Sequence, residues 1–347
     1  MAGSIIDHSL GLKKETTYGT AVTVDRFFEW HRGNSIDWDP QPIEGEGMQA
    51  TYGGFTLTNR RVPGFGQASG SLKFDLLSKT FGTLLEGAVG TASSTVVSGA
   101  TYQQLFTPTQ AAAVLNSYTV QEGIYLPDGS TVTYTYAGCS IKGFEIDAPS
   151  RAPLTLMVDV DGRSLATGTA YATPSYTAAS TLITTALPTS GAATIGGTLT
   201  VPTTTALGST SGGTAAAIKA WNLKGDNDLD TGREVVGGRN QPTVGSRAAS
   251  ILKTTIEYDA TTGATLRDAQ INQTAVPLLL SVTTAESLST GVAQLQLAVP
   301  AAFINSGAIP QPSDNKVITT DIEWKIARDV SKTAAYYLVL RTADSAL

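Results

Sequence analysis

Few residues of this 347-residue chain have the types and spacing that catalysis or metal binding requires. The chain has two histidines, His8 and His31, and one cysteine, Cys139, and none of them lies in a spacing typical of a metal site or a nucleophile. A single cysteine cannot form a disulfide within the chain or supply a thiolate cluster. We expect Cys139 to be a small buried residue and the histidines to have structural or solvated roles.

Three aspartates at alternate positions, Asp226, Asp228 and Asp230, have the spacing of calcium-loop ligands, which bring several oxygens to one ion. The pattern fails where Thr231 replaces the glycine of the sharp turn and Gly237 replaces the closing glutamate. A solvated turn is the simpler interpretation, and an unorthodox cation site is the alternative.

Pairs of acids two positions apart could suggest glycoside hydrolysis, in which two carboxyl groups flank the scissile bond. Acids with this spacing on a strand share its solvent-facing side, so the pattern is common without catalysis. The segment 64–70 resembles a dinucleotide-binding loop, but its last glycine is one position late and a strand follows it. The sequence therefore predicts neither an enzyme nor a cofactor. The acid pairs are Asp37 and Asp39, Glu44 and Glu46, and Asp159 and Asp161.

The composition also limits the function. Charged residues make up 15% of the chain, well below the roughly 25% typical of soluble domains. Much of the surface is therefore uncharged, and burial between subunits of an assembly would explain this. The net charge of -6 opposes tight binding to a phosphate backbone, which requires many cationic contacts. The segment 1–12 lacks a basic end followed by a sustained apolar stretch, and no apolar run approaches the roughly 18 residues of a membrane span, so we expect no membrane insertion.

Alternation of apolar and polar residues with a period of two is the main structural signal. It occurs around positions 132–136, 154–160, 252–258, 322–326 and 336–340, and a turn at Pro127-Asp128-Gly129 suits a hairpin. One buried and one solvated face per strand predicts antiparallel strands in a sandwich or barrel. The apolar sets are Val132, Tyr134 and Tyr136; Leu154, Leu156, Val158 and Val160; Leu252, Thr254, Ile256 and Tyr258; Ile322, Trp324 and Ile326; and Tyr336, Leu338 and Leu340.

Helical periodicity is persuasive in only one segment, just after residue 80. Ser78 is a candidate N-cap, and Gly87 or Gly90 would end the helix. The preceding strand carries Leu72, Phe74 and Leu76 on one face. The apolar positions of the helix, spaced at i, i+3, i+4 and i+7, are Phe81, Leu84, Leu85 and Ala88.

Two longer segments have unusual compositions. Residues 43–69 are Gly-rich, too polar for a core and too aromatic for a free linker, so we expect a long exposed hairpin. Residues 164–218 contain no Asp, Glu, Lys or Arg, which first suggests disorder. The turn and strand at 195–201 favour ordered strands joined by mobile loops instead. With no fixed-period repeat and no charged or Pro-rich linker, we expect a single domain, 1–347.

The segment Lys13-Lys14-Glu15-Thr16-Thr17-Tyr18-Gly19-Thr20, with the apolar and aromatic run 22–30, resembles the opening of the major tail tube proteins of bacteriophages with long, non-contractile tails. The family's positions match Gly11, Glu15, Tyr18-Gly19-Thr20 and Phe27-Phe28. Further segments follow in the family's order: Gly70-Ser71-Leu72, Leu84-Leu85 to Gly90, Ser117 to Val120, Tyr136 to Cys139, and Ile322-Glu323-Trp324 to Tyr337-Leu338-Val339.

This resemblance implies a mainly β tail-tube fold with one flanking helix, an extended N-terminal arm at 1–21 and a long loop at 43–69 that reaches the adjacent ring. It implies a structural protein of the virion tail, made in the host cytoplasm, whose hexameric rings stack into a tube that carries DNA. Tape-measure, tail-tip and tail-terminator proteins would be partners, and DNA would pass without specific binding. Candidate contacts between subunits or rings are Glu15, Tyr18, Glu44, Glu46, Arg60, Arg61 and Phe65.

Two other functions are compatible with the same strands. A β-rich adhesin or capsid decoration protein would share the Thr-rich strands and the low charge, but it would expose aromatic residues at its loop tips. A carbohydrate-active enzyme would share only the β-sandwich and the scattered acids. We also expect the arm before Val22 to lie against a neighbouring subunit, because it lacks a core-forming face.

Overall fold

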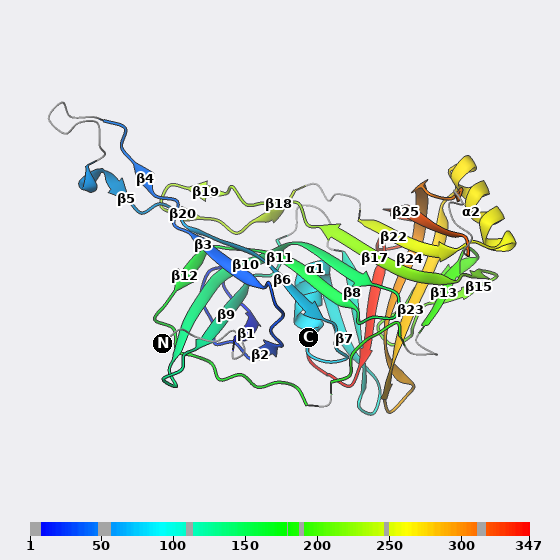
Figure 1. Ribbon diagram of the computed structural model, residues 1–347, viewed down its shortest axis with the longest axis horizontal. Helices are drawn as coiled ribbons and strands as arrows, with labels where there is room; N and C mark the ends of the chain where they lie inside the picture. Colours follow the sequence, from blue (N-terminus) through cyan, green and yellow to red (C-terminus); the bar gives the residue numbers. More distant parts are fainter. Residues whose placement is uncertain are drawn as a thin grey trace.

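A computed structural model of the chain describes residues 8–47, 57–108, 114–178, 180–186, 191–245, 250–310 and 317–347. It is built mainly of antiparallel strands, as expected, which curve around a shared core (Figure 1). The first part of the chain contains β1 (Ser9–Lys14), β2 (Arg26–Phe28), β3 (Ser35–Asp39), β4 (Ile43–Glu44), a 3-10 helix (Thr58–Arg60), β5 (Arg61–Val62), β6 (Gln67–Asp75), α1 (Gly82–Val89), β7 (Gly90–Ser98), β8 (Thr101–Pro108), β9 (Tyr118–Tyr125), β10 (Thr131–Ala148), β11 (Thr155–Gly162) and β12 (Ser164–Ala166).

The second part is again strand-rich. It contains β13 (Gly191–Ile195), β14 (Thr198–Thr200), β15 (Ser209–Ser211), β16 (Thr214–Ala215), β17 (Ile218–Asp226), β18 (Leu229–Asp230), β19 (Glu234–Val235), β20 (Gly238–Arg239), β21 (Thr243–Val244), β22 (Ile251–Glu257), α2 (Ala260–Asn272), β23 (Val276–Ser287), β24 (Val292–Ser306), β25 (Thr319–Ala327) and β26 (Tyr337–Thr342).

The long strand β10 organises the first part. Its first half pairs with β9 and β12, and its second half pairs with β11 and β17. The change of partners occurs at a bulge between Tyr136 and Cys139, where Gly138 has a φ of +69°. Only glycine adopts this conformation without strain, so the bulge bends β10 from one sheet into the other.

A continuous eight-stranded sheet runs through both parts of the chain. Its order is β3, β6, β11, β10, β17, β22, β25 and β24, and every neighbouring pair is antiparallel. The pairing of β10 with β17 joins the two parts, and β8 with β26 makes a second link.

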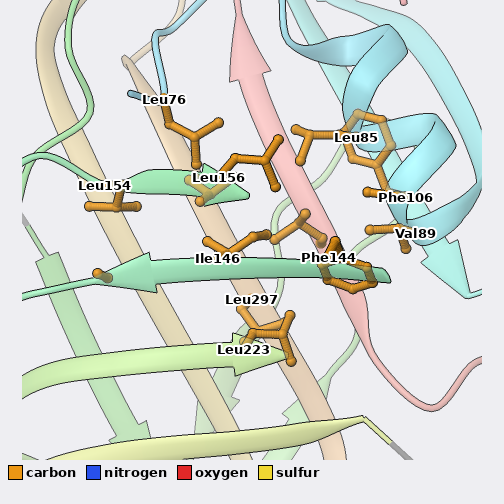
Figure 2. Close-up of a cluster of buried hydrophobic side chains, with 14 of the residues drawn as sticks. Leu76, Leu85, Val89, Phe106, Phe144, Ile146, Leu154, Leu156, Leu223 and Leu297 are labelled. Atoms are coloured by element: carbon orange, nitrogen blue, oxygen red, sulfur yellow. The ribbon is translucent and has the colours of Figure 1, made fainter. Parts of the chain in front are cut away.

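The core lies on the inner face of this sheet. The alternating residues predicted on β11, β22 and β25 are buried, apart from Tyr258 just beyond β22, which is half-buried. Ile146 of β10, Leu223 of β17 and Leu297 of β24 lie in one cluster, so both parts of the chain share it (Figure 2). Fully burying each such side chain contributes roughly 1.5–3 kcal/mol. The prediction for 132–136 holds less well, because Val132 is exposed and Thr135 is buried.

Helix α1 forms where the sequence predicts it, although its cap differs. The helix begins after Phe81, and the Ser78 hydroxyl bonds the Glu286 carboxylate instead of the helix N-terminus. Its end is as expected: Gly90 has a φ of +129° and donates its N–H to the Glu86 carbonyl. Every residue of α1 is buried, so the helix is an internal element held by packing.

A second helix, α2, corrects the expectation of a single flanking helix. Asp259 caps it by accepting hydrogen bonds from the backbone N–H groups of Thr261 and Thr262, and Gln273 ends it with a φ of +49°. The buried residues of α2 are Thr262, Gly263, Leu266 and Ala269. Only Leu266 among them is a large apolar residue, so the helical pattern in the sequence is weak. The Asp259 N-cap is the local feature of the sequence that could have predicted this helix.

The N-terminal arm also needs correction. Strand β1 lies between β2 and β9, and its Leu10 and Leu12 are buried. The expectation that the residues before Val22 lack a core-forming face was therefore wrong for 9–14. Residues 1–7 lie outside the described residues.

The uncharged segment 164–218 contains five short strands, β12 to β16. Between β12 and β13, the described residues 167–178 and 180–186 form no named strand, but they are bonded to the rest of the molecule: the Ile183 N–H donates to the Leu76 carbonyl and the Leu154 N–H donates to the Ile183 carbonyl. Gly196 and Gly197 link β13 to β14, as the turn predicted. The mobility of the loops stays a prediction.

Candidate assembly and channel surfaces

Glu15 lies inside the chain. Its side chain is buried, and its carboxylate accepts four hydrogen bonds: from the Gly19 N–H (2.9 Å), the Ser117 hydroxyl (2.8 Å), the Thr119 hydroxyl (3.0 Å) and the Gly138 N–H (2.8 Å). These groups belong to the turn after β1, to β9 and its approach, and to the β10 bulge. The carboxylate therefore fixes the bulge and the turn together. Glu15 thus has a structural role within the chain, and its contact with another subunit stays a prediction.

Tyr18 lies at the same bulge. The Arg163 guanidinium stands 5.4 Å from the centre of the Tyr18 ring, and the ring packs beside Gly138. Burial raises the pKa of the Tyr18 hydroxyl. Tyr18 is half-buried, so part of its ring still faces solvent. The motif 15–20 thus belongs first to the fold of the chain.

The structure describes both arms of the hairpin that the sequence predicts at 43–69. β4 and β5 pair, and the hairpin projects away from the body (Figure 1). Glu44 and Arg61 form an ion pair with each other at 3.3 Å, and Arg60 donates to the Gly47 carbonyl. Glu46 is exposed. Residues 48–56, including the aromatic Tyr52 and Phe55 of the predicted loop, lie outside the described residues.

The described part of the hairpin carries exposed apolar side chains. Ile43 is 60% exposed, Val62 49% and Phe65 42%. Apolar residues gathered on a projecting element mark a contact surface more often than isolated ones do. The charges named for contacts between rings are thus partly paired within the hairpin, while its apolar side chains remain available.

A second hairpin spans Asn227 to Gly245 and was missed in the sequence. β18 pairs with β21 and β19 pairs with β20. Arg239 anchors it through a buried ion pair with Asp161 (3.4 Å) and a hydrogen bond to the Thr231 carbonyl. Burial raises the pKa of Asp161, although Gln67 and Arg239 favour its ionised form. At the tip, Val235 and Val236 are exposed. No local pattern marks Arg239 as the partner of a residue 78 positions away.

The eight-stranded sheet presents one polar face to solvent. On it, Thr255 donates to Asp321 (2.6 Å), Lys253 pairs with Glu323 (3.6 Å) and Asn222 donates to Glu145 (2.6 Å). Acids outnumber lysines, so the face carries net negative charge. The acids are Asp37, Asp39, Asp75, Glu145, Asp147, Asp159, Asp226, Glu257, Asp321 and Glu323; the lysines are Lys73, Lys142, Lys219, Lys224, Lys253 and Lys325.

Each outer strand of this sheet has one edge that no described strand covers. Within the described residues, β3 pairs only with β6, and the end of β24 beyond Ala302 pairs only with β25. On the β3 edge, the backbone of Ile36 is bonded within the chain: its carbonyl accepts from the Tyr136 hydroxyl and its N–H donates to the Glu122 carboxyl. Unpaired strand edges are templates for pairing with another chain.

The described residues bring no three His, Cys, Asp or Glu side chains together in a way that could hold a metal ion. At the calcium-like spacing, the Asp228 N–H donates to Asp226, which makes a local turn. Cys139 is buried as expected, and burial raises the pKa of its thiol. His8 stacks on Trp30. Neither described helix is long and apolar enough to span a membrane.

The family model of phage tail tube proteins matches residues 6–326, which is nearly the whole chain. This chain belongs to the phage tail tube family. The match leaves out only the last residue of β25, the loop after it and β26 among the elements described above. A search of curated proteins found no match. Because it belongs to this family, the chain is a structural tail protein that assembles into a tube and associates with other tail proteins. The match confirms the resemblance seen in the sequence.

Proposed function

We propose that this tail tube protein forms rings that stack into a hollow tube and that the polar face of its eight-stranded sheet lines the channel. A single observation supports this most strongly: a long, continuous sheet has a solvated face, a core-packed face and two outer edges that no described strand covers. Pairing of those edges between copies closes the sheet into a barrel and removes both edges. The family resemblance implies hexameric rings, so six copies of the tube fold complete each ring.

The channel carries DNA into the host. The excess of acids on the polar face suits passage, because a phosphate backbone is retained only by many cationic contacts. The lysines on this face are interspersed with acids, and Lys219 and Lys253 are paired with Glu257 and Glu323. DNA therefore passes without specific binding.

The projecting hairpin reaches the adjacent ring. Its exposed Ile43, Val62 and Phe65 supply apolar contact, and Glu46 and Arg60 add charges at the rim of the contact. A projection on one surface that fits another surface of the next copy gives a heterologous contact, which generates open stacks. At the ends of the stack, tail-tip and tail-terminator proteins complete the tail, and a tape-measure protein occupies the channel during assembly.

Thiol labelling tests the orientation of the sheet. Cys139 is buried, so Ser69→Cys adds one accessible thiol on the polar face, and Ser98→Cys adds one in the β7–β8 turn away from it. Tubes seen by negative-stain electron microscopy are treated with a small maleimide and with one that carries a large polymer. We expect the polymer reagent to label free Ser69→Cys subunits but not assembled ones, while the small reagent labels both.

The Ser98→Cys variant shows whether the polymer reagent reaches the assembled wall at all. Equal labelling of Ser69→Cys by the polymer reagent in tubes and in free subunits would place the polar face on the outside. Strictly monomeric protein, alone and with a tail-tip initiator, would contradict assembly itself.

A further inference from the structure

The strand pairings of the first part of the chain recur in the second part. β1, β2, β3, β6, β9, β10, β11 and β12 correspond, in chain order, to β13, β16, β17, β22, β23, β24, β25 and β26. In the first set the antiparallel pairs are β1–β2, β1–β9, β9–β10, β10–β11, β10–β12, β11–β6 and β6–β3. In the second they are β13–β16, β13–β23, β23–β24, β24–β25, β24–β26, β25–β22 and β22–β17.

The helices follow the same correspondence. α1 comes after β6 and packs against β10, while α2 comes after β22 and packs against β24, the counterpart of β10. The two strands that lead into these helices, β6 and β22, also hold equivalent places in the eight-stranded sheet. Figure 1 shows the two sets on either side of the molecule.

The two longest strands share a further irregularity. β10 changes partners at Gly138, between its β12-paired and β11-paired halves. β24 changes from β26 to β25 across Pro300, which lies between the paired residues Ala298 and Ala301. Glycine and proline both interrupt a regular strand, so each long strand leaves one sheet and enters another at the equivalent place.

The projecting hairpins also correspond. The first hairpin, with β4 and β5, is inserted between β3 and β6, and the second, with β18 to β21, is inserted between β17 and β22. Among the described elements, two hairpins have no counterpart. The β7–β8 hairpin follows α1 alone and joins the second set through β26, and the β14–β15 hairpin lies between β13 and β16 alone.

We propose that the chain contains the tube-fold unit twice, at 8–166 and 191–342, and that three chains, not six, close each ring. This inference rests on the proposed function, because two units from each of three chains supply the six copies of the fold in a ring. It also replaces the single-domain interpretation of 1–347. Three chains with eight strands each give a channel barrel of 3 × 8 = 24 strands.

The junction inside the chain then shows how chains meet. Within the chain, β10 of the first unit pairs with β17 of the second over six residues, from Gly143 with Asp226 to Ala148 with Trp221. The counterparts of β10 and β17 are β24 and β3, the two outer strands whose far edges no described strand covers. The end of β24 in one chain therefore lies beside β3 of the next chain and repeats the internal junction around the ring.

Electron cryomicroscopy of assembled tubes of the unmodified protein, with scanning-transmission mass measurement, tests the count. The chain has a mass of 36.0 kDa, so we expect 3 × 36.0 = 108 kDa per ring, against 6 × 36.0 = 216 kDa for six chains. We expect a map with strict three-fold and approximate six-fold symmetry, in which β24 of each chain meets β3 of the next.

Six chains per ring, or three chains joined through other strands, would overturn this inference and leave the tube function standing. Absence of any tube would instead overturn the proposed function, and the ring count with it.

Discussion

Replacing Glu122 by glutamine should remove a pH-dependent loss of stability. Glu122 lies on β9 opposite Leu10 and Tyr134 and is only 7% exposed. Its carboxyl accepts from the Ile36 backbone N–H, but its Oε1 has no hydrogen-bond partner in the described part of the chain. The Tyr136 hydroxyl donates to the Ile36 carbonyl and so does not serve Glu122. Burial raises the pKa of Glu122 from 4.5 to about 7.

The size and sign of the effect follow from that shift. In the unfolded chain Glu122 loses its proton near pH 4.5, whereas in the folded chain it keeps the proton to about pH 7. Between these values the folded state binds more protons, so Glu122 makes stability fall as pH rises and then level off. A shift of about 2.5 pKa units corresponds to about 3 kcal/mol. With an unfolding entropy of about 2.1 cal/mol/K per residue, this is a change of about 4 °C in the melting temperature.

Calorimetric or circular dichroism melting of the unassembled Glu122→Gln and unmodified subunits at pH 4 and pH 8.5 measures the effect. We expect the variant to gain about 4 °C relative to the unmodified subunit on going from pH 4 to pH 8.5, because glutamine is neutral at both. Glu46→Gln, on the exposed hairpin, is the matched control and should show no such gain. A difference between variant and unmodified protein that is the same at both pH values would refute the buried-acid reasoning.

Three further changes test other parts of the fold. Glu15→Ala should lower the free energy of unfolding by about 3–5 kcal/mol, because it leaves the Gly138 N–H and three other donors without their acceptor. In the same urea titration, the control Glu44→Ala at an exposed position should lower it by under about 1 kcal/mol. Arg239→Met should remove the cationic partner of Asp161 and speed amide exchange in 227–245 but not in β22. Unchanged exchange in 227–245 would contradict the anchoring role. Deleting residues 1–17 should unfold the subunit, because it removes β1 from its place beside β9. A product that is folded by circular dichroism but forms no tubes would restore the interpretation of this segment as an arm.

The sequence predicted the elements whose pattern is local. Alternation placed β11, β22 and β25 because a strand with one buried face must repeat every two residues. The Gly90 end of α1 and the Pro127-Asp128-Gly129 turn were also confirmed, since each depends on a backbone conformation that a short motif determines. The projecting hairpin was recognised for a similar reason, from a composition that fits neither core nor linker.

Features that depend on distant partners were not predictable in this way. Glu15 is charged and precedes a turn, which suggests a surface residue, yet its acceptors are filled by groups on β9 and β10 more than 100 positions away. β1 was assigned to an arm because its apolar residues are few, but a strand of six residues between two neighbours needs only Leu10 and Leu12 to join the core. In both cases tertiary packing decides what the local sequence leaves open.

The repeated topology shows the same principle at the scale of the whole chain. A pairing order is determined by which strands have a buried face, where turns allow reversal and where a long strand can bend, and many different residues meet these requirements. Gly138 and Pro300 share no chemistry, yet both allow a strand to change sheets at equivalent points. A search for similar residues at a fixed period therefore finds nothing, and the unmatched β7–β8 and β14–β15 hairpins disturb any period further. What the two units share is the order of their contacts, and that order becomes visible only when the strands are paired.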